Sequence, residues 1–361
     1  MATPGTFTCS VMADITIKQE EMFTSGIKKE LVPKTNVLRG LAERQQVVVN
    51  DVMRGKKCVG VEIYTLRSCD TIVGSCDAAG FEIDCVIAGT ETGTECKTFT
   101  NNLCEVAKFS VSEEDCDNHA SWEDAFAYRE MYALVKLDEA IAKKVGPYLQ
   151  TAADVNPWTS GLASVPAGQV NNELEVAAAN WDSSLLGEFH YAATLAEMND
   201  YTILSDRNLW TPHFLAKYEG AACCTTDALF GDSVLGNPII FDAFNLDTIT
   251  STQSTYLVDS SALVFWGKNQ YENDTPLKRG KDNFIYYRKK SPSLVYRSGN
   301  QVLPVYYDVI GQETCSDNAG TFGRHFVWNF NIEFRGGLVS NLADCNSRIG
   351  VLEYQNDCTV C

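Results

Sequence analysis

Residues 81–87 read FEIDCVI, and they lie within Cys58–Cys116, the segment that decides how this chain folds. Their apolar side chains alternate with acidic ones, which is the period-two pattern of a strand with one buried face. Residues 58–64 predict a second strand, and residues 106–111 predict a third. A narrow β arm of this kind is only marginally stable alone. We therefore expect it to lie against something else, which favours an assembling protein over a catalyst.

The same segment holds seven of the fourteen cysteines of the 361-residue chain. The only C-x-x-C motif runs from Cys358 to Cys361, without a second pair or a nearby histidine, so we expect no metal site. Two interpretations stay open. Cysteines such as Cys85 and Cys104 pack as small apolar side chains on strand faces, or some thiols pair after the protein leaves a reducing cell. The candidate disulfide residues are Cys69 with Cys76, followed by Cys358 with Cys361.

Composition and charge describe an ordinary globular chain, with 45% hydrophobic and 21% charged residues, long enough for one large domain or two. We find no apolar run that could span a membrane and no secretory signal in residues 1–21, so we expect folding in a cytoplasm. The net charge of −18 argues against a general basic surface for nucleic acid.

The charge is unevenly distributed along the chain. Residues 18–57 carry nine basic and five acidic side chains, whereas residues 58–120 carry three basic and twelve acidic ones. These segments either complement each other between neighbouring copies or are both solvated surface. The basic run 288–290 faces either a polyanion or solvent.

Helical signals follow the β arm. Ser121 is a candidate N-cap with acidic residues in the first turn, and about twenty-five residues up to Gly146-Pro147 would span close to 40 Å. Asp182 caps a second predicted helix over residues 183–199, and a third is predicted over residues 208–218.

The remaining pattern is β. Short apolar strands are predicted at residues 238–241, 257–258, 262–266 and 284–288. The clearest strand is Phe326–Phe334, whose aromatic residues all point one way and need a helix to cover them. Its length matches the long helix, so we expect the two to pack together. The order of elements predicts an α+β fold with segregated elements.

Catalytic motifs are weak. Gly231-Asp232-Ser233 resembles the start of a serine-esterase block, but His325 at the start of the long strand has no acidic companion in a D-x-x-H arrangement. The four histidines are scattered, and no phosphate-binding glycine loop occurs. We expect no enzyme activity and no cofactor.

This order of elements resembles the Hong Kong 97 capsid fold of the major capsid proteins of tailed bacteriophages. The resemblance implies an N-terminal arm, an extended β-hairpin loop (E-loop) that reaches over a neighbouring subunit, a peripheral domain with a long spine helix, and an axial domain. In that order they would occupy residues 1–57, 58–120, 121–170 and 171–300, with the closing strand of the peripheral domain and a C-terminal tail in residues 301–361.

The resemblance also implies what the chain does. It would form hexamers and pentamers of an icosahedral virion shell around double-stranded DNA, assembled in the host cytoplasm. A separate scaffolding protein is expected, because the N-terminus lacks a long charge-rich helical segment; a portal and a decoration protein are further partners, and no membrane is involved. The inter-subunit loop would carry Cys58, Cys85, Cys96, Lys97, Cys104 and Cys116. The basic residues that face DNA or a neighbour would be Lys28, Lys29, Arg54, Lys56 and Lys57.

Two other functions stay open. A nanocompartment shell, or another phage structural protein, would have a related build, and an encapsulated enzyme gene beside it would identify the former. A disulfide-stabilised surface binding module would need a signal sequence, which is not seen in this chain.

Overall fold

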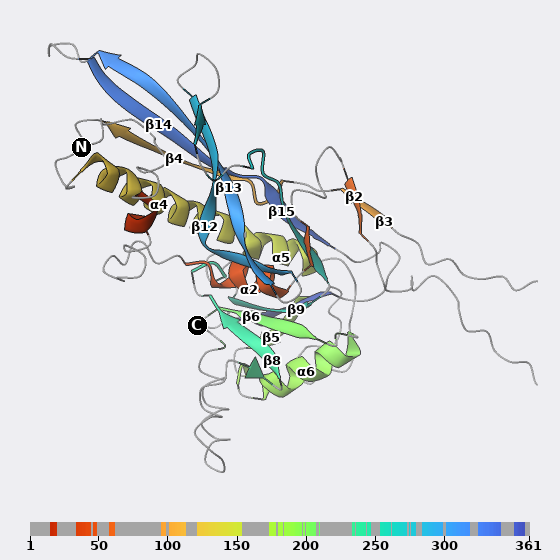
Figure 1. Ribbon diagram of the computed structural model, residues 1–361. Helices are drawn as coiled ribbons and strands as arrows, with labels where there is room; N and C mark the ends of the chain where they lie inside the picture. The colour runs from red at the N-terminus through yellow and green to blue at the C-terminus, as the bar shows by residue number, and fades with distance from the viewer. Residues whose placement is uncertain are drawn as a thin grey trace, which may run out of the picture.

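The computed structural model describes residues 15–19, 34–44, 46–48, 58–61, 95–98, 101–112, 121–153, 173–177, 180–182, 184–196, 198, 200–206, 209, 233–234, 236–242, 244–246, 253–260, 262–272, 274, 276–278, 284–298, 301–317, 324–340 and 350–357. These residues form a mixed α+β fold, as the sequence predicts. In Figure 1 a long helix lies along one sheet, and a second sheet with its own helix lies below it.

A five-stranded antiparallel sheet forms the first layer. Its strand order is β11 (Leu277–Lys278), β12 (Phe284–Ser298), β13 (Gln301–Asp317), β14 (Arg324–Phe334) and β4 (Glu105–Ser112). The predicted strand 326–334 is therefore confirmed as β14. The predicted strand 106–111 exists as β4, but it pairs with β14 instead of joining the β arm. The alternating pattern predicted which side chains of this strand share a face, but it did not predict which strand pairs with it.

Helix α4 (Trp122–Ala142) covers this sheet, which confirms the expected pairing of the long helix with the aromatic strand. Phe109 of β4 stacks on Phe330 of β14 with ring centroids 4.7 Å apart, and Phe126 of α4 meets Phe330 edge-on at 5.1 Å. Phe126 and Phe330 belong to one buried core, and the half-buried Phe109 packs against it. At ~1.5 Å per residue the 21-residue helix is about 32 Å long.

The start of α4 confirms the predicted cap, whereas its end differs from the prediction. The Asp124 amide donates to Ser121 Oγ at 3.2 Å. The helix ends at Ala142, and α5 (Val145–Ala153) follows after a turn. Pro147 explains the break, because its ring would clash with the carbonyl of residue 143 in a continuous helix and because it lacks the N–H.

A six-stranded sheet forms the second layer, in the order β5 (Glu173–Ala177), β16 (Val351–Asp357), β9 (Gln253–Asp259), β6 (Tyr201–Ser205), β8 (Asn237–Phe241) and β7 (Ser233–Val234). Helix α6 (Leu185–Leu195) covers it, with Phe189 edge-on to Tyr354 of β16 at 4.6 Å. The predicted helix 183–199 is thus confirmed with shorter bounds. Apart from Leu209, the predicted helix 208–218 lies outside the described residues.

Sheet membership departs from the predicted order in two places. Strand β12 belongs to the first sheet, although the sequence interpretation placed it in the axial domain of residues 171–300. Strand β16 lies inside the second sheet, although the residues after the long closing strand were expected to form a C-terminal tail. A three-stranded sheet of β1 (Gln46–Val48), β10 (Leu263–Gly267) and β15 (Gly336–Ser340) extends from the end of β14.

Helix α2 (Asn36–Arg44) contacts strands of both large sheets, β12 and β8. Gly40 lies buried inside this helix. A Cβ atom on Gly40 would meet Ile240 Cδ1 at 2.0 Å, so glycine allows a close approach between helix and strand. The Val37 amide donates to Asp242 Oδ2 at 2.9 Å, which caps the helix start from a distant part of the chain.

Among the described residues, no helix is long and apolar enough to cross a membrane.

Candidate assembly interface

Strands β2 (Cys58–Val61) and β3 (Glu95–Thr98) form an antiparallel ladder in which Cys58 pairs with Thr98 and Val61 with Glu95. Residues 62–94, which connect the two strands, lie outside the described residues. The ladder pairs with no other described strand, and Figure 1 shows it set apart from both large sheets. Two short strands alone are marginally stable in water. The ladder thus needs support from outside the sheets described above.

Two buried carboxylates hold α4 on the first sheet, and the first is Glu130. Tyr287 on β12 donates to Glu130 Oε1 at 2.6 Å, and the Gln19 amide donates to Oε2 at 2.6 Å. Lys289 Nζ lies 3.2 Å from the same Oε2, so the buried charge is compensated. Burial, followed by the Glu130 charge, raises the pKa of Tyr287 well above its usual value, so the phenol stays a donor.

The second carboxylate is Asp138, two turns further along α4 and also fully buried. Ser293 donates to Asp138 Oδ2 through its hydroxyl at 2.5 Å and its amide at 3.2 Å, and Ser291 Oγ donates to Oδ2 at 2.9 Å. Tyr307 of β13 donates to Oδ1. Burial raises the pKa of Asp138 to about 6, while these hydrogen bonds act in the opposite direction.

The Asp138 contacts coincide with an irregularity in β12. The register of the β12–β13 pair shifts between Lys290 and Val295, so the residues between them leave the ladder. Asp138 satisfies the polar groups that this bulge frees, and Thr35 Oγ1, just before α2, donates to Ser293 Oγ at 3.0 Å. The helix, the bulged strand and the start of α2 are thus joined at one point.

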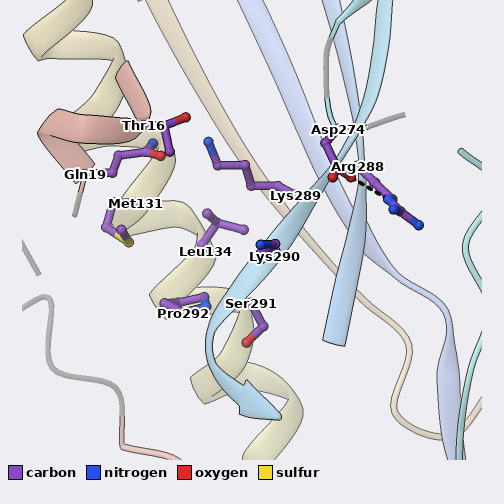
Figure 2. A pocket seen from close by; sticks show the side chains of 10 residues that line it. All are labelled: Thr16, Gln19, Met131, Leu134, Asp274, Arg288, Lys289, Lys290, Ser291 and Pro292. Atoms are coloured by element: carbon purple, nitrogen blue, oxygen red, sulfur yellow. Dashed lines mark hydrogen bonds and ion pairs between the residues drawn. The ribbon is translucent and has the colours of Figure 1, made fainter. Parts of the chain in front are cut away.

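A cleft of about 470 Å³ lies between α4, β12 and the helical residues 15–19. Figure 2 shows Lys289 directed toward Gln19 and Thr16, while Arg288 turns the other way to Asp274. Arg288 also lies over the Tyr306 ring, 4.1 Å from its centroid. Two cations of the basic run 288–290 are therefore in internal ion pairs.

A groove of about 340 Å³ runs between α4 and β4. Tyr128 and Tyr132 of α4 stack along it with centroids 6.3 Å apart, and Lys136 Nζ lies 5.5 Å from the Tyr132 centroid. Tyr132 is 40% exposed and Val106 of β4 is 45% exposed. The groove is thus an apolar surface with a basic rim, beside the edge strand of a sheet.

The structure describes few of the residues that the sequence singled out. Cys104 is half-buried with a free thiol, and burial is the main cause of its raised pKa. The backbone of Cys58, Cys96 and Lys97 lies in the β2–β3 ladder. The other candidates lie outside the described residues: Cys69, Cys76, Cys85, Cys116, Cys358, Cys361, Lys28, Lys29, Arg54, Lys56 and Lys57. Within the described part of the chain, no group of three or more His, Cys, Asp or Glu side chains could hold a metal ion.

Glu130 and Asp138 were missed by the sequence interpretation. A signal was present, because both follow the helical spacing of the apolar face defined by Phe126, Leu134 and Ile141. A carboxylate on such a face predicts donors on the opposing strand.

No protein-family model matches the chain, and no curated protein sequence matches it significantly. Solved structures with a similar arrangement come from phage particles. The mature capsid of bacteriophage PhiM1 has a TM-score of 0.44 at 8% identity, covering 88% of this chain and 86% of that one. The capsid of cyanophage P-SCSP1u has a TM-score of 0.47 at 9% identity, covering 90% and 89%. A chain from Mycobacterium phage Cain has a TM-score of 0.41 at 14% identity, covering 91% and 92%.

Proposed function

We propose that this chain is a major capsid protein that self-assembles into hexamers and pentamers of an icosahedral phage head enclosing double-stranded DNA. One observation carries the proposal: the β2–β3 ladder closes a long loop and pairs with no other described strand. A loop of this size with a marginal base gains its stability from another copy of the chain.

The layers of the fold supply the remaining parts of such a subunit. We assign α4 as the spine helix, the five-stranded sheet as the peripheral domain, the six-stranded sheet as the axial domain, and residues 58–98 as the E-loop. The buried Glu130 and Asp138 give the spine helix a fixed position on its sheet, because each carboxylate accepts hydrogen bonds from β12 or its bulge. A subunit that must fit many identical neighbours needs that uniqueness.

The proposal includes the untested residue roles. Cys69 with Cys76, and Cys358 with Cys361, pair once particles leave the cell, while the loop cysteines and Lys97 lie at inter-subunit contacts. The basic residues between Lys28 and Lys57 face DNA or a neighbour without reading bases. A scaffolding protein, a portal and a decoration protein are the expected partners, and the chain acts in the virion without enzymatic activity.

Expression of the chain alone and with its genomic neighbours, followed by negative-stain microscopy, tests the proposal. Closed particles, sheets or rings of six are expected, whereas stable monomers under every condition would contradict it. A matched variant replaces residues 62–94 by Asn-Gly, which keeps the β2–β3 register through a tight turn. This variant should stay folded by circular dichroism and form no particles. Portal and terminase genes nearby favour a phage head; an encapsulated enzyme gene favours a nanocompartment.

Thiol counting tests the cysteine roles separately. Fourteen trapped thiols in purified particles, with identical gel mobility with and without reductant, would contradict pairing. Fewer thiols with unchanged mobility would place the bonds within one subunit.

A further inference from the structure

Helix α2 is tied to both layers at its first turn. In Figure 1 it lies between the two large sheets, and it contacts β12 of the first and β8 of the second. Toward the second layer, the Val37 amide donates to Asp242 Oδ2 at 2.9 Å. Toward the first layer, Thr35 Oγ1 donates to Ser293 Oγ at 3.0 Å, and Ser293 Oγ in turn donates to Asp138. The helix therefore starts at a polar joint with one buried carboxylate on each side.

The first-layer side of this joint is a network of hydroxyl groups. Ser291, Ser293 and Tyr307 each donate a hydroxyl hydrogen to Asp138. A serine or threonine hydroxyl can either donate or accept, so these bonds can reverse. When Asp138 is protonated, it can donate to Ser293 Oγ, and the bond between Ser293 and Thr35 then changes direction. The network thus accommodates both charge states of Asp138, but at different free energies.

Among the described residues, no cation contributes to the pKa of Asp138, which burial raises to about 6 against the effect of its hydrogen bonds. Tyr307 is the titratable group that faces it from β13, and burial raises the pKa of this phenol well above its usual value. The cations of the adjacent elements are directed elsewhere: Lys289 to Glu130, Arg288 to Asp274, Lys136 to Glu139, Lys144 to Glu105, Arg39 to Glu43, Lys34 over the Phe244 ring, and Lys143 and Lys290 at the surface. The ionised form of Asp138 is therefore the less stable one in the closed joint.

We infer that the start of α2 is a latch between the two layers, and that ionisation of Asp138 opens its first-layer side. The segments that open are residues 291–294 of the bulge and the first turn of α2, because the hydroxyl network holds both. The apolar side chains of α2, Leu38 and Leu41 among them, share one core with α4 and β12, so the opening stays local. The inference does not depend on the proposed function, because every contact it uses lies within one chain.

The direction of the switch follows from proton binding. Opening lets water reach the Asp138 carboxylate, so its pKa returns toward the ordinary 3.8. The open state then binds the proton less tightly than the closed state, and a rise in pH favours it. With a pKa of about 6 in the closed state and 3.8 in the open state, the opening equilibrium constant should rise about tenfold between pH 5 and pH 7.5.

Hydrogen exchange of single amides in the full chain tests the latch. The Leu294 amide, bound to Ser291 Oγ at 2.8 Å, reports on the bulge, and the Arg39 amide, bound to the Thr35 carbonyl at 2.9 Å, reports on the first turn of α2. Their protection factors, corrected for the intrinsic exchange rate, should fall about tenfold between pH 5 and pH 7.5. The Asp242 amide, which donates within the second layer at 2.9 Å, should stay more protected. Equal opening at all three amides would mean global unfolding and would contradict a local latch.

Two substitutions at one position test the tie between α2 and the bulge. Thr35→Val removes the hydroxyl that donates to Ser293, and Thr35→Ser keeps a hydroxyl and serves as the matched control. In Thr35→Val the Leu294 amide should keep its pH dependence, while the Arg39 amide should lose it. Thr35→Ser should behave like the wild type at both amides. An Arg39 amide that stays pH-dependent in Thr35→Val would show that α2 is not latched through this hydroxyl.

Asp138→Asn tests the source of the pH dependence, because asparagine does not ionise. Both reporter amides should then lose their tenfold change between pH 5 and pH 7.5. A wild-type slope in this variant, or flat protection in the wild type, would overturn the role of Asp138. If Asp138→Asn does not fold, the two Thr35 variants still decide, since each of their outcomes supports or contradicts the latch.

Discussion

Helices α4 and α6 each cover a sheet, but they are held by different means. Helix α6 buries only apolar side chains against the six-stranded sheet, among them Phe189. Helix α4 has a comparable apolar face and in addition buries two carboxylates that accept hydrogen bonds from the opposing sheet. Apolar packing tolerates small shifts, whereas directed hydrogen bonds require one register. The position of α4 on its sheet is therefore fixed more strictly than the position of α6 on its own.

The largest effects on stability are expected in the apolar core, which both layers have. Phe330→Ala in the first layer and Phe189→Ala in the second should each lower the free energy of unfolding by about 3–5 kcal/mol, because both rings are fully buried. Urea denaturation with an unchanged m-value is the measurement. A much smaller loss in one layer would mean that its apolar core is not comparable to the other.

Removal of Glu130 tests what distinguishes α4. Glu130→Ala should cost about 3–4 kcal/mol, since it leaves Lys289 and Tyr287 without their buried acceptor. The control is Lys136→Ala, which breaks a partly exposed ion pair with Glu139 on the same helix and should cost about 0.5 kcal/mol or less. Equal losses in the two variants would show that the buried network has no special role.

Asp138 makes the stability of the first layer depend on pH. Its pKa is raised from 3.8 to about 6, so the folded chain binds a proton where the unfolded chain does not. Its contribution to stability is full at low pH and is lost as the pH rises through about 6. The difference between pH 4 and pH 7.5 should amount to roughly 2–3 kcal/mol. Denaturation series should show this dependence in the wild type and a flatter one in Asp138→Asn; identical slopes would contradict the assignment.

The smallest effect is expected on the outer face of α6. Tyr191 and Leu195 are 51% and 41% exposed, so replacing both by serine should change the free energy of unfolding by only about 0.5 kcal/mol. Thermal denaturation checks this. A large loss would show that the outer face of α6 is part of the core.

Local elements could be predicted from the sequence because their signals are local. The cap at Ser121 and the alternation of Phe326–Phe334 identified α4 and β14 without any knowledge of their neighbours. Strand β13 was not predicted from the sequence. Its Gly311 makes room for packing, since a Cβ there would lie 2.5 Å from Phe330 Cε1.

The pairing partners of the strands could not be predicted from the sequence, for a physical reason. Period-two patterns give the faces of a strand, but the choice of partner depends on the whole sheet, as β4, β12 and β16 show. The buried carboxylates were missed for a related reason. Glu130 and Asp138 become interpretable only once β12 and its bulge are known to lie opposite them.

The position of β16 has a consequence for synthesis. This strand separates β5 from β9, so the six-stranded sheet stays split until residue 357 has been translated. Nascent chains therefore carry two open strand edges while they are still on the ribosome. The sheet closes only after translation passes this point, which delays a complete subunit until then and makes products truncated before Val351 prone to aggregate.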